Sequence, residues 1–238
     1  WVNDCLGDTY DAYPFAGALY TASHAHDCST IGGVPDTDPQ TRWQSAQASP
    51  LTATGTITVK DQYGWDFTGL PTAGVLAWNP SMAFGNVTAS RQAAWTIVGS
   101  GDYLAFGGEF PRVNGVAQQG LTRYALPAAA PRKIGPTYVP GSDPVATSTE
   151  AGVVRVSFAG LWDRDDATLT YDLYRDSTKV TTISDVESRF WNQPNLGFSD
   201  TGRTPGASHR YQVRVTDSAG NTQWSAKSAP VIVAGTPA

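Results

Sequence analysis

The sequence has 238 residues, enough for two ordinary domains that each bury a core, and it carries a net charge of −5 at pH 7. Its basic residues form no cluster that would neutralise phosphates, so we exclude nucleic acid as a partner. No stretch approaches the ~20 apolar residues of a transmembrane helix, which excludes a helical membrane span. Charged residues make up only 16 %, with 24 Gly and 16 Pro, and this composition favours an all-β fold of short strands and turns.

The N-terminal region contains the two cysteines of the chain, Cys5 and Cys28. They match neither a CxxC motif nor a Cys/His metal site, so we predict a disulfide that closes a short loop and stabilises this region by roughly 3 kcal/mol. Two buried free thiols are the alternative. A disulfide, few lysines and an Ala/Thr/Gly-rich composition indicate a secreted, extracellular bacterial protein. Because the chain begins at Trp1 without a signal peptide, we interpret it as a processed piece.

The segment HAHDC at 24–28 is the part of the sequence most similar to a functional site. On a strand, His24 and His26 point to the same face, which is the spacing of two metal ligands such as those of Zn²⁺. Asp27 or a more distant acid would complete the set. The alternative is a polar strand end whose histidines bond to neighbouring strands. Since the sequence marks no third ligand, we expect no required cofactor.

The first half of the chain contains an internal repeat, since residues 101–127 can be aligned with residues 17–46. In this alignment Leu19 corresponds to Tyr103, an offset of 84 residues, and Gln40 corresponds to Leu121, an offset of 81 residues. A unit of about 45 residues with several strands has the size of one propeller blade. The extra length of the first unit lies in an insertion at 51–71.

Residues 76–126 contain the pattern WNP…YLAFGGEF…VNG…LTRY, which resembles the repeat of large bacterial secreted β-propellers. The resemblance implies that Gly107 and Gly108 permit close approach of backbones near a central channel. It also implies that residues 1–126 form about two blades. Two blades cannot close a ring, so further blades would come from upstream sequence or another chain. An irregular β-sandwich is the alternative.

One tryptophan of the first half differs from the others in its sequence context. Most would be packed between blades, whereas Trp65 lies in the insertion between Gly64 and Asp66. Sugar rings stack on exposed aromatic faces, so Trp65 is the candidate ligand-binding residue and a glycan its expected ligand.

Sequence motifs for catalysis are missing. There is no G-x-S-x-G elbow, no Gly-rich phosphate loop and no H-E-x-x-H. Glycoside hydrolysis needs two facing carboxylates. Glu109 is the one Glu of the first half, and its partner would be Asp27, Asp66 or Asp102, none of which a motif marks. We therefore assign no catalytic residue.

A proline-rich stretch divides the chain. Residues 125–144 contain five prolines, which fit neither a central strand nor a helix interior. We predict a linker at 127–142 that separates the propeller-like region, 1–126, from a second domain, 143–238.

The second domain contains three clear alternations of apolar and polar residues. They run from Val154 to Phe158, from Tyr171 to Tyr174 and through residues 211–215, with turn signals between them. Six or seven short strands in about ninety residues is typical of a β-sandwich.

The segments 153–162, 169–180 and 205–225 resemble strands B, C–C′ and F–G of a fibronectin type III module. In this resemblance Tyr211 matches the tyrosine that caps the turn before strand F, and Trp224 lies near the start of strand G. The chain departs from the family at Phe158, near the position of the usual strand-B tryptophan. The resemblance implies an immunoglobulin-like β-sandwich, and such modules mostly act as spacers.

An acidic cluster follows the first strand of this domain. Asp163, Asp165 and Asp166 could chelate Ca²⁺ through loop oxygens, although the segment is shorter than an EF-hand loop and lacks its Gly and terminal Glu. A solvated turn is the other interpretation.

Two functional hypotheses follow. The first is a non-catalytic extracellular binding and scaffolding protein, whose propeller-like part binds a glycan or protein partner and whose sandwich is a spacer. The second is the C-terminal portion of a secreted carbohydrate-active or other hydrolytic enzyme with its catalytic blades upstream. Two acids converging within about 5–10 Å in an open cleft would favour the second.

Overall fold

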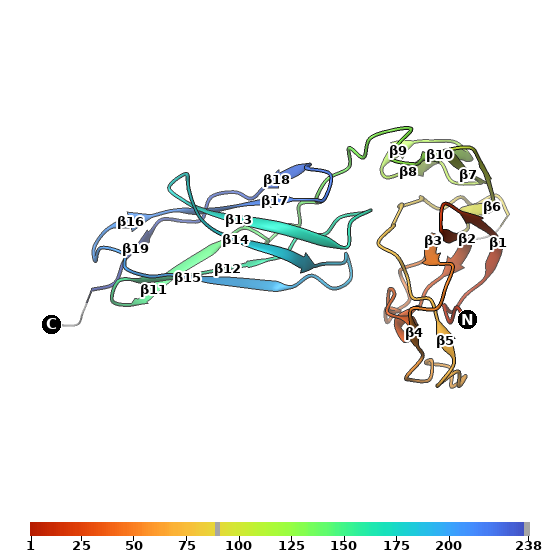
Figure 1. Ribbon diagram of the computed structural model, residues 1–238, viewed down its shortest axis with the longest axis horizontal. Helices are drawn as coiled ribbons and strands as arrows, with labels where there is room; N and C mark the ends of the chain where they lie inside the picture. Colours follow the sequence, from red (N-terminus) through yellow and green to blue (C-terminus); the bar gives the residue numbers. More distant parts are fainter. Residues whose placement is uncertain (89–90, 236–238) are drawn as a thin grey trace. The chain divides into compact units, whose positions relative to one another are not determined.

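The computed structural model describes residues 1–88 and 91–235, and it is all-β, with several antiparallel sheets (Figure 1). Within the described ranges, helical structure is confined to one 3-10 turn, Ser29–Ile31. None of the helical structure described is long and apolar enough to span a membrane. The chain divides into two compact units between Arg132 and Lys133, a position inside the predicted linker.

The first unit contains two three-stranded antiparallel sheets with the orders β1-β2-β3 and β6-β7-β10. In each sheet a hairpin is followed by a third strand that pairs with the second strand of the hairpin, so the two parts of the repeat share one topology. The six strands are β1 (Thr9–Phe15), β2 (Ala18–Ala25), β3 (Gln44–Pro50), β6 (Ala94–Ser100), β7 (Tyr103–Gly108) and β10 (Leu121–Ala125).

Strand pairing corrects the register of the repeat, by one residue in the hairpins and by six residues in the third strands, where Leu121 corresponds to Ala46 and not to Gln40. Phe15 pairs with Ala18 at the end of the first hairpin, and Ser100 pairs with Tyr103 at the end of the second. Tyr103 therefore corresponds to Ala18, and not to Leu19 as the sequence alignment has it. The alignment matched similar letters, whereas the two-residue turn sets the register, and a slip of one residue exchanges the two faces of a strand.

The two sheets of the first unit share a hydrophobic core. Trp78 packs between them, with its ring 4.9 Å from that of Tyr20 and 5.7 Å from that of Phe106. The sheets also meet through polar contacts, since the Asp11 carboxylate on β1 accepts hydrogen bonds from the Ile97 N–H at 2.8 Å and the Thr96 hydroxyl at 2.9 Å on β6. The expectation that tryptophans pack between the repeated sheets is confirmed for Trp78.

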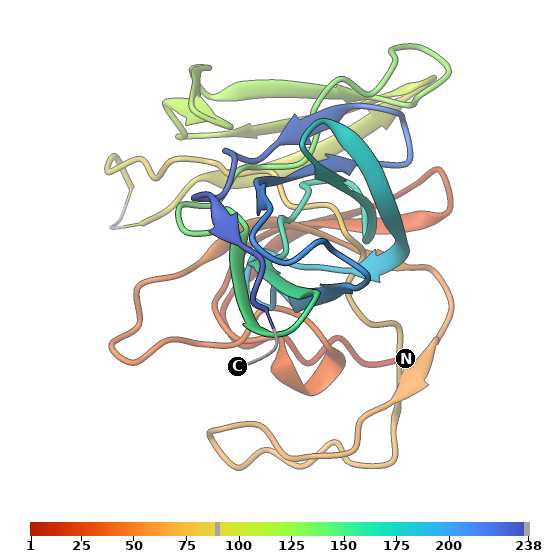
Figure 2. The ribbon, with the colours of Figure 1, turned by 90° about the vertical axis from the view of Figure 1, so that its left-hand side faces the viewer.

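The insertion at 51–71 contains the short strand β4 (Gly55–Thr56), which pairs with β5 (Pro71–Thr72). The loop between these strands extends from the rest of the unit (Figures 1 and 2). Its anchor is Ile57, whose side chain is fully buried and whose N–H donates to the Leu70 carbonyl at 3.0 Å. A second small hairpin joins β8 (Arg112–Val113) to β9 (Val116–Ala117).

The second unit has two sheets around one core, with the orders β11-β12-β15 and β14-β13-β17-β18, and a short pair β16-β19. The strands are β11 (Val145–Glu150), β12 (Val153–Ala159), β13 (Thr168–Arg175), β14 (Thr178–Glu187), β15 (Asn195–Asp200), β16 (Ser208–His209), β17 (Tyr211–Thr216), β18 (Thr222–Trp224) and β19 (Val231–Ile232). Val154, Val156 and Phe158 are buried while Arg155 and Ser157 are exposed, which confirms the predicted alternation.

One hydrogen bond joins the two sheets of the second unit, and the end of the linker packs on the same unit. Tyr211 on β17 is fully buried, and its hydroxyl donates to Asp200 on β15 at 2.8 Å. Part of the predicted linker packs on this unit, because the Thr137 N–H donates to the Trp162 carbonyl at 2.8 Å and Val139 contacts the core.

Candidate functional site

The predicted disulfide is confirmed, since Cys5 and Cys28 are bonded to each other. The Cys28 side chain is fully buried, and Gln47 Nε2 donates to its Sγ at 3.0 Å. Gly33 lies directly against Cys28, where a Cβ would clash with the Cys28 Cβ. The bond therefore fixes the segment that follows β2, and this segment carries His26 and Asp27.

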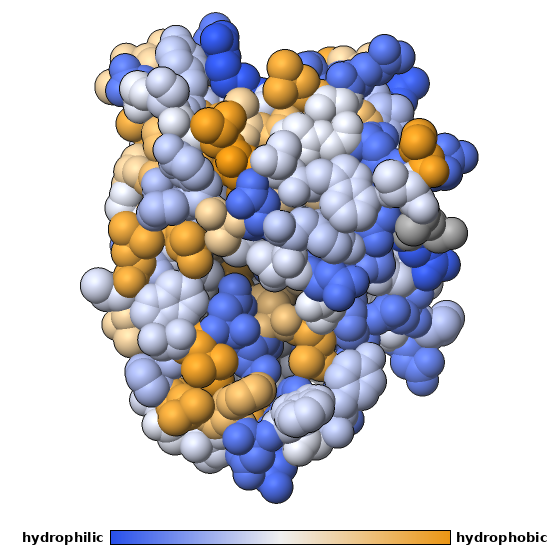
Figure 3. Space-filling view, turned by 90° about the vertical axis from the view of Figure 1, so that its right-hand side faces the viewer, coloured by the Kyte–Doolittle hydropathy of each residue, from blue (hydrophilic) through white to orange (hydrophobic). Residues whose placement is uncertain are grey.

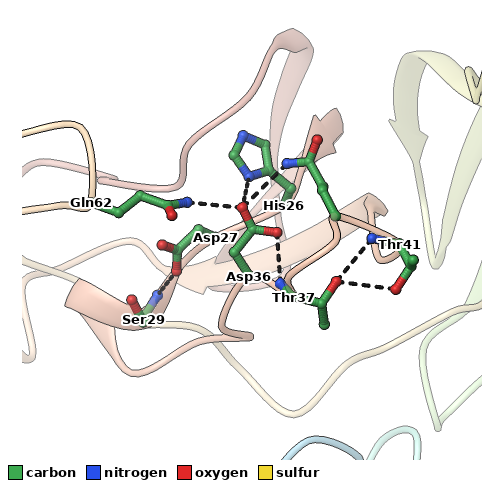
Figure 4. Close-up of polar contacts among 8 residues, drawn as sticks. His26, Asp27, Ser29, Asp36, Thr37, Thr41 and Gln62 are labelled. Atoms are coloured by element: carbon green, nitrogen blue, oxygen red, sulfur yellow. Dashed lines mark hydrogen bonds and ion pairs between the residues drawn. The ribbon is translucent and has the colours of Figure 1, made fainter.

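His26 belongs to a polar network centred on Asp36 (Figure 4). The Asp36 carboxylate accepts hydrogen bonds from His26 Nδ1 at 2.9 Å, Gln62 Nε2 at 2.8 Å and the Thr37 N–H at 2.8 Å. Burial alone would raise the pKa of Asp36, but the hydrogen bonds from Gln62, Thr37 and His26 outweigh it and hold that pKa below its ordinary value. The network ties the loop of the insertion to the segment after β2.

His24 lies in a different environment. Its imidazole stacks on the ring of Trp43 at 5.7 Å with 7° between the planes, and the Arg91 guanidinium lies 4.1 Å from the Trp43 ring centroid. Burial lowers the pKa of His24, which favours the neutral ring. Among the described residues, neither His24 nor His26 belongs to a group of three metal-ligating side chains, so the residues present do not assemble the set that a tetrahedral zinc site needs.

Trp65 is 66 % exposed, the most exposed tryptophan among the described residues. It belongs to a tight turn that we name the aromatic turn, residues 60–66. The Asp61 carboxylate, largely buried, accepts hydrogen bonds from the backbone N–H groups of Tyr63 and Trp65, both at 2.9 Å. Gly64 has φ +89°, a conformation that glycine adopts without strain.

Tyr63, two residues before Trp65, is 65 % exposed, and its ring lies 6.3 Å from that of His26, so the aromatic turn presents two large rings to solvent. Sequence reasoning missed Tyr63 and Asp61. The signal was the D-x-x-G spacing of Asp61 and Gly64, which is typical of a turn closed by an Asp side chain. Elsewhere on the side of the molecule seen in Figure 3, apolar side chains form small separate groups and no continuous patch.

The two exposed charged groups of the aromatic turn are paired with each other. Lys60 Nζ lies 3.2 Å from the Asp66 carboxylate, and Asp66 also accepts the Thr68 N–H at 3.1 Å. Contacts from Thr68, and then from Lys60, hold the pKa of Asp66 below its ordinary value. The turn therefore presents two aromatic rings and several hydrogen-bonding groups without an excess cation.

Glu109 has a structural environment. Its carboxylate accepts the Thr88 hydroxyl and the N–H groups of Val87 at 2.6 Å and Thr88 at 3.0 Å. The Thr88 hydroxyl is the main cause of a lowered pKa at Glu109. A general acid needs the opposite shift, so this carboxylate is unsuited to protonating a leaving group at neutral pH. Of its proposed partners, Asp27 accepts the Ser29 N–H at 2.9 Å.

The acidic cluster of the second unit is brought together in space. One carboxylate oxygen from each of Asp163, Asp165 and Asp166 lies within 4.8 Å of the others. Asp163 is only 2 % exposed, and burial, followed by the neighbouring Asp165, raises its pKa to about 7. Three carboxylates this close repel one another. A Ca²⁺ ion, which oxygen ligands suit chemically, would relieve this repulsion, and so would a proton on Asp163.

Comparison with known proteins gives one partial similarity. The chain matches no family model. Exoglucanase B of Cellulomonas fimi is 35 % identical to it over 97 residues. The match covers 39 % of this chain and 8 % of the exoglucanase, so the chain spans a small part of that enzyme's length.

Proposed function

We propose that this chain is part of a secreted, non-catalytic binding and scaffolding protein whose first unit binds a neutral glycan through the aromatic turn. The observation that carries the proposal is the exposure of Trp65 and Tyr63 on a turn held by the buried Asp61 carboxylate. Exposing two large rings on one turn forgoes burial that would stabilise the fold, which points to a role in binding.

The chemistry of the turn supports a sugar as the ligand. An aromatic ring offers an apolar face for stacking, and Gln62, whose Nε2 donates to Asp36, offers its amide oxygen as an acceptor for hydroxyl groups. The one cation of the turn, Lys60, is paired with Asp66, so a carboxylated sugar would gain little there. A glucan is the natural first probe, because the chain has partial similarity to an exoglucanase.

Secretion is the second part of the proposal. Disulfides persist in oxidising compartments, so the Cys5–Cys28 bond supports an extracellular location. The partial similarity to exoglucanase B supports the same location. An extracellular location would also bring the aromatic turn to its glycan.

We propose a fold family for the second unit. The seven strands of its two sheets, and the buried Tyr211 that bonds to Asp200 at the start of β17, support a fibronectin type III-like sandwich that acts as a spacer.

We likewise propose propeller-like blades for the first unit. Its two sheets have the same strand order and pack together through one core, which supports a blade relationship, with further blades from upstream sequence or another chain. Each sheet has three strands among the described residues, whereas a propeller blade has four.

The partial match to exoglucanase B favours one alternative, in which this chain is the C-terminal portion of a secreted carbohydrate-active enzyme with its catalytic part upstream. In that case the aromatic turn would hold substrate for a catalytic site elsewhere. The lowered pKa of Glu109 speaks against a general acid in this chain. Glucan hydrolysis by the chain alone, abolished by Glu109→Gln, would replace the binding proposal by an enzymatic one.

The test is affinity electrophoresis of the full chain in gels containing a soluble β-glucan. We expect the glucan to retard the chain, and Trp65→Ala to lower the apparent affinity up to about tenfold, since stacking on one ring is worth up to about 1.5 kcal/mol. Trp1→Ala is the matched control, because Trp1 is also exposed, at 40 %, but lies outside the turn. No retardation, or equal loss in both variants with unchanged circular dichroism, would reject the proposal.

A further inference from the structure

The open face of the sheet β14-β13-β17-β18 carries a second group of aromatic and charged side chains. The rings of Tyr174 on β13 and Trp224 on β18 lie 4.9 Å apart, tilted by 49°. Strand β17 lies between these two strands, and the guanidinium carbon of its Arg214 is 5.8 Å from the Tyr174 ring and 5.7 Å from the Trp224 ring. We name this group the sheet-face cluster.

A buried carboxylate fixes the base of the cluster. Asp172, on the same face of β13 as Tyr174, accepts hydrogen bonds from Arg214 at 2.5 Å and from the Thr182 hydroxyl at 2.5 Å. Lys179 Nζ lies 3.3 Å from the same carboxylate. Asp172 is only 5 % exposed, so these contacts hold Arg214 against the aromatic rings rather than leaving it free in solvent.

A cavity of about 250 Å³ lies beside Tyr174 and Gln212. The remaining lining residues are Asp176, Ser177, Arg210 and Lys227. Asp176 is already bonded, to His209 Nδ1 at 2.6 Å and to the Arg210 N–H at 2.9 Å. The Lys227 ammonium, by contrast, has no polar partner within the described part of the chain. The cavity is smaller than the ~300–1,000 Å³ of drug-sized ligand sites and suits a single small polar unit.

The charges of this face favour an anion. Four basic side chains lie there, Lys179, Arg210, Arg214 and Lys227. Asp172 pairs with Lys179 and Arg214. The Arg210 guanidinium, by contrast, donates to the Ser228 carbonyl, and Asp176 accepts only the backbone N–H of Arg210. The chain as a whole carries a net charge of −5, so a local excess of positive charge is not an average property of its surface. The four residues come from separate parts of the sequence, and the sheet assembles them.

We propose that the sheet-face cluster is a binding site for a polysaccharide of carboxylated sugars, with one uronate in the cavity. Lys227 and Arg210 pair with the carboxylate of this uronate, and Tyr174 offers a face to its ring. Trp224 contacts the next sugar of the polysaccharide. Gln212 hydrogen-bonds a hydroxyl group. The sandwich then binds its own ligand and is more than a spacer, which goes beyond the function proposed for the first unit.

The experiment is affinity electrophoresis of the full chain in gels containing polygalacturonate. We expect retardation that weakens as NaCl is raised, because screening reduces the ionic part of binding. Trp224→Ala and the double variant Arg210→Ala/Lys227→Ala should each reduce the apparent affinity at least tenfold. Arg155→Ala is the matched charge control, because Arg155 lies on the other sheet, where it pairs with Glu150, and this variant should bind as the original chain does.

The two glycan sites are separated by their ligands and variants. Trp65→Ala should leave polygalacturonate binding unchanged, and Trp224→Ala should leave β-glucan binding unchanged. Absence of retardation, or equal effects of Arg155→Ala and the double variant, would overturn the sheet-face proposal. Equal retardation by single-stranded DNA at the same charge density would also overturn it, because a site that accepts any polyanion does not recognise a uronate.

Discussion

Asp61 and Trp65 close the aromatic turn through two hydrogen bonds, one made by the Asp61 side chain and one made by the backbone. The Asp61 side chain accepts the Trp65 N–H at 2.9 Å, and the Asp61 N–H donates to the Trp65 carbonyl at 3.2 Å. A residue that is almost entirely buried thus sets the position of one that is mostly exposed. The turn is therefore preorganised, and a ligand that stacks on Trp65 does not have to order it.

This relationship predicts that Asp61→Ala weakens glucan binding although Asp61 lies beneath the exposed rings. Without the carboxylate, the N–H groups of Tyr63 and Trp65 lose their acceptor and the turn becomes mobile. We expect a loss of about 1–2 kcal/mol in binding free energy, or five- to thirtyfold in affinity. Titration calorimetry with a soluble glucan measures it. Asp66→Ala, which removes an exposed carboxylate of the same turn, should cost much less, and an equal cost would contradict the positioning role.

Sequence reasoning located Trp65 because its neighbours are turn-forming residues in an insertion, and local chemistry of this kind is readable from the chain. It did not find the partners of His26. Asp36 and Gln62 come from segments far apart in sequence, and only the fold brings them to the same imidazole. The metal hypothesis for His24 and His26 rested on their alternation along a strand. It did not anticipate that Trp43 stacks on one ring and Asp36 bonds the other.

The Cys5–Cys28 bond predicts a large effect of reduction on the first unit. Replacing both cysteines by serine should destabilise that unit by roughly 3 kcal/mol, because the unfolded chain regains the entropy of a loop that the bond closed. Urea denaturation followed by circular dichroism measures this loss. Reduction of the original chain should lower the urea midpoint of the first unit by the same amount, whereas the urea midpoint of the second unit should not change. A shift in both units would mean that the disulfide stabilises more than its own region.

The strands of the second unit were predictable because a half-buried strand alternates apolar and polar residues, as Tyr211, Val213 and Val215 do. In the first unit, β2 and β3 are buried on both sides over much of their length, with small residues such as Ala22 and Ala46 in the core. Small residues give no periodic signal. The repeat was therefore recognised from similar residues, and its register was one residue out in the hairpins and six residues out in β3 and β10.

The hydrogen bond of Tyr211 should make a measurable contribution to the free energy of unfolding of the second unit. Its hydroxyl donates to Asp200, which also pairs with Arg175 at 2.6 Å and with Arg203 at 3.3 Å. Tyr211→Phe should destabilise the second unit by about 1.5–3 kcal/mol, the usual range for a hydrogen bond to a charged group. Asp200→Asn should cost more, because Arg175 would lose its charged partner. Denaturation in urea gives both values, and a smaller loss for Asp200→Asn would contradict this order.

Asp163 predicts that the second unit loses stability as the pH rises. The pKa of this buried carboxyl is about 7 in the folded chain, against 3.8 for an ordinary aspartate. The folded state therefore holds a proton that the unfolded state has released between about pH 4 and pH 7. The resulting stabilisation is fully present below the unfolded pKa and is lost as the pH rises through 7. Its size is on the order of 1–4 kcal/mol.

Urea denaturation at pH 5 and pH 8 tests this dependence, and Asp163→Asn should flatten it while raising stability at pH 8, since an amide carries no charge to bury. Asp185→Asn, at an exposed position, is the control and should leave the pH dependence unchanged. Adding CaCl₂ at pH 8 separates a proton from a cation as the group that relieves the repulsion. If Ca²⁺ stabilises the original chain but not Asp163→Asn, the three carboxylates chelate it. Equal stability at both pH values without Ca²⁺ would contradict the assigned pKa.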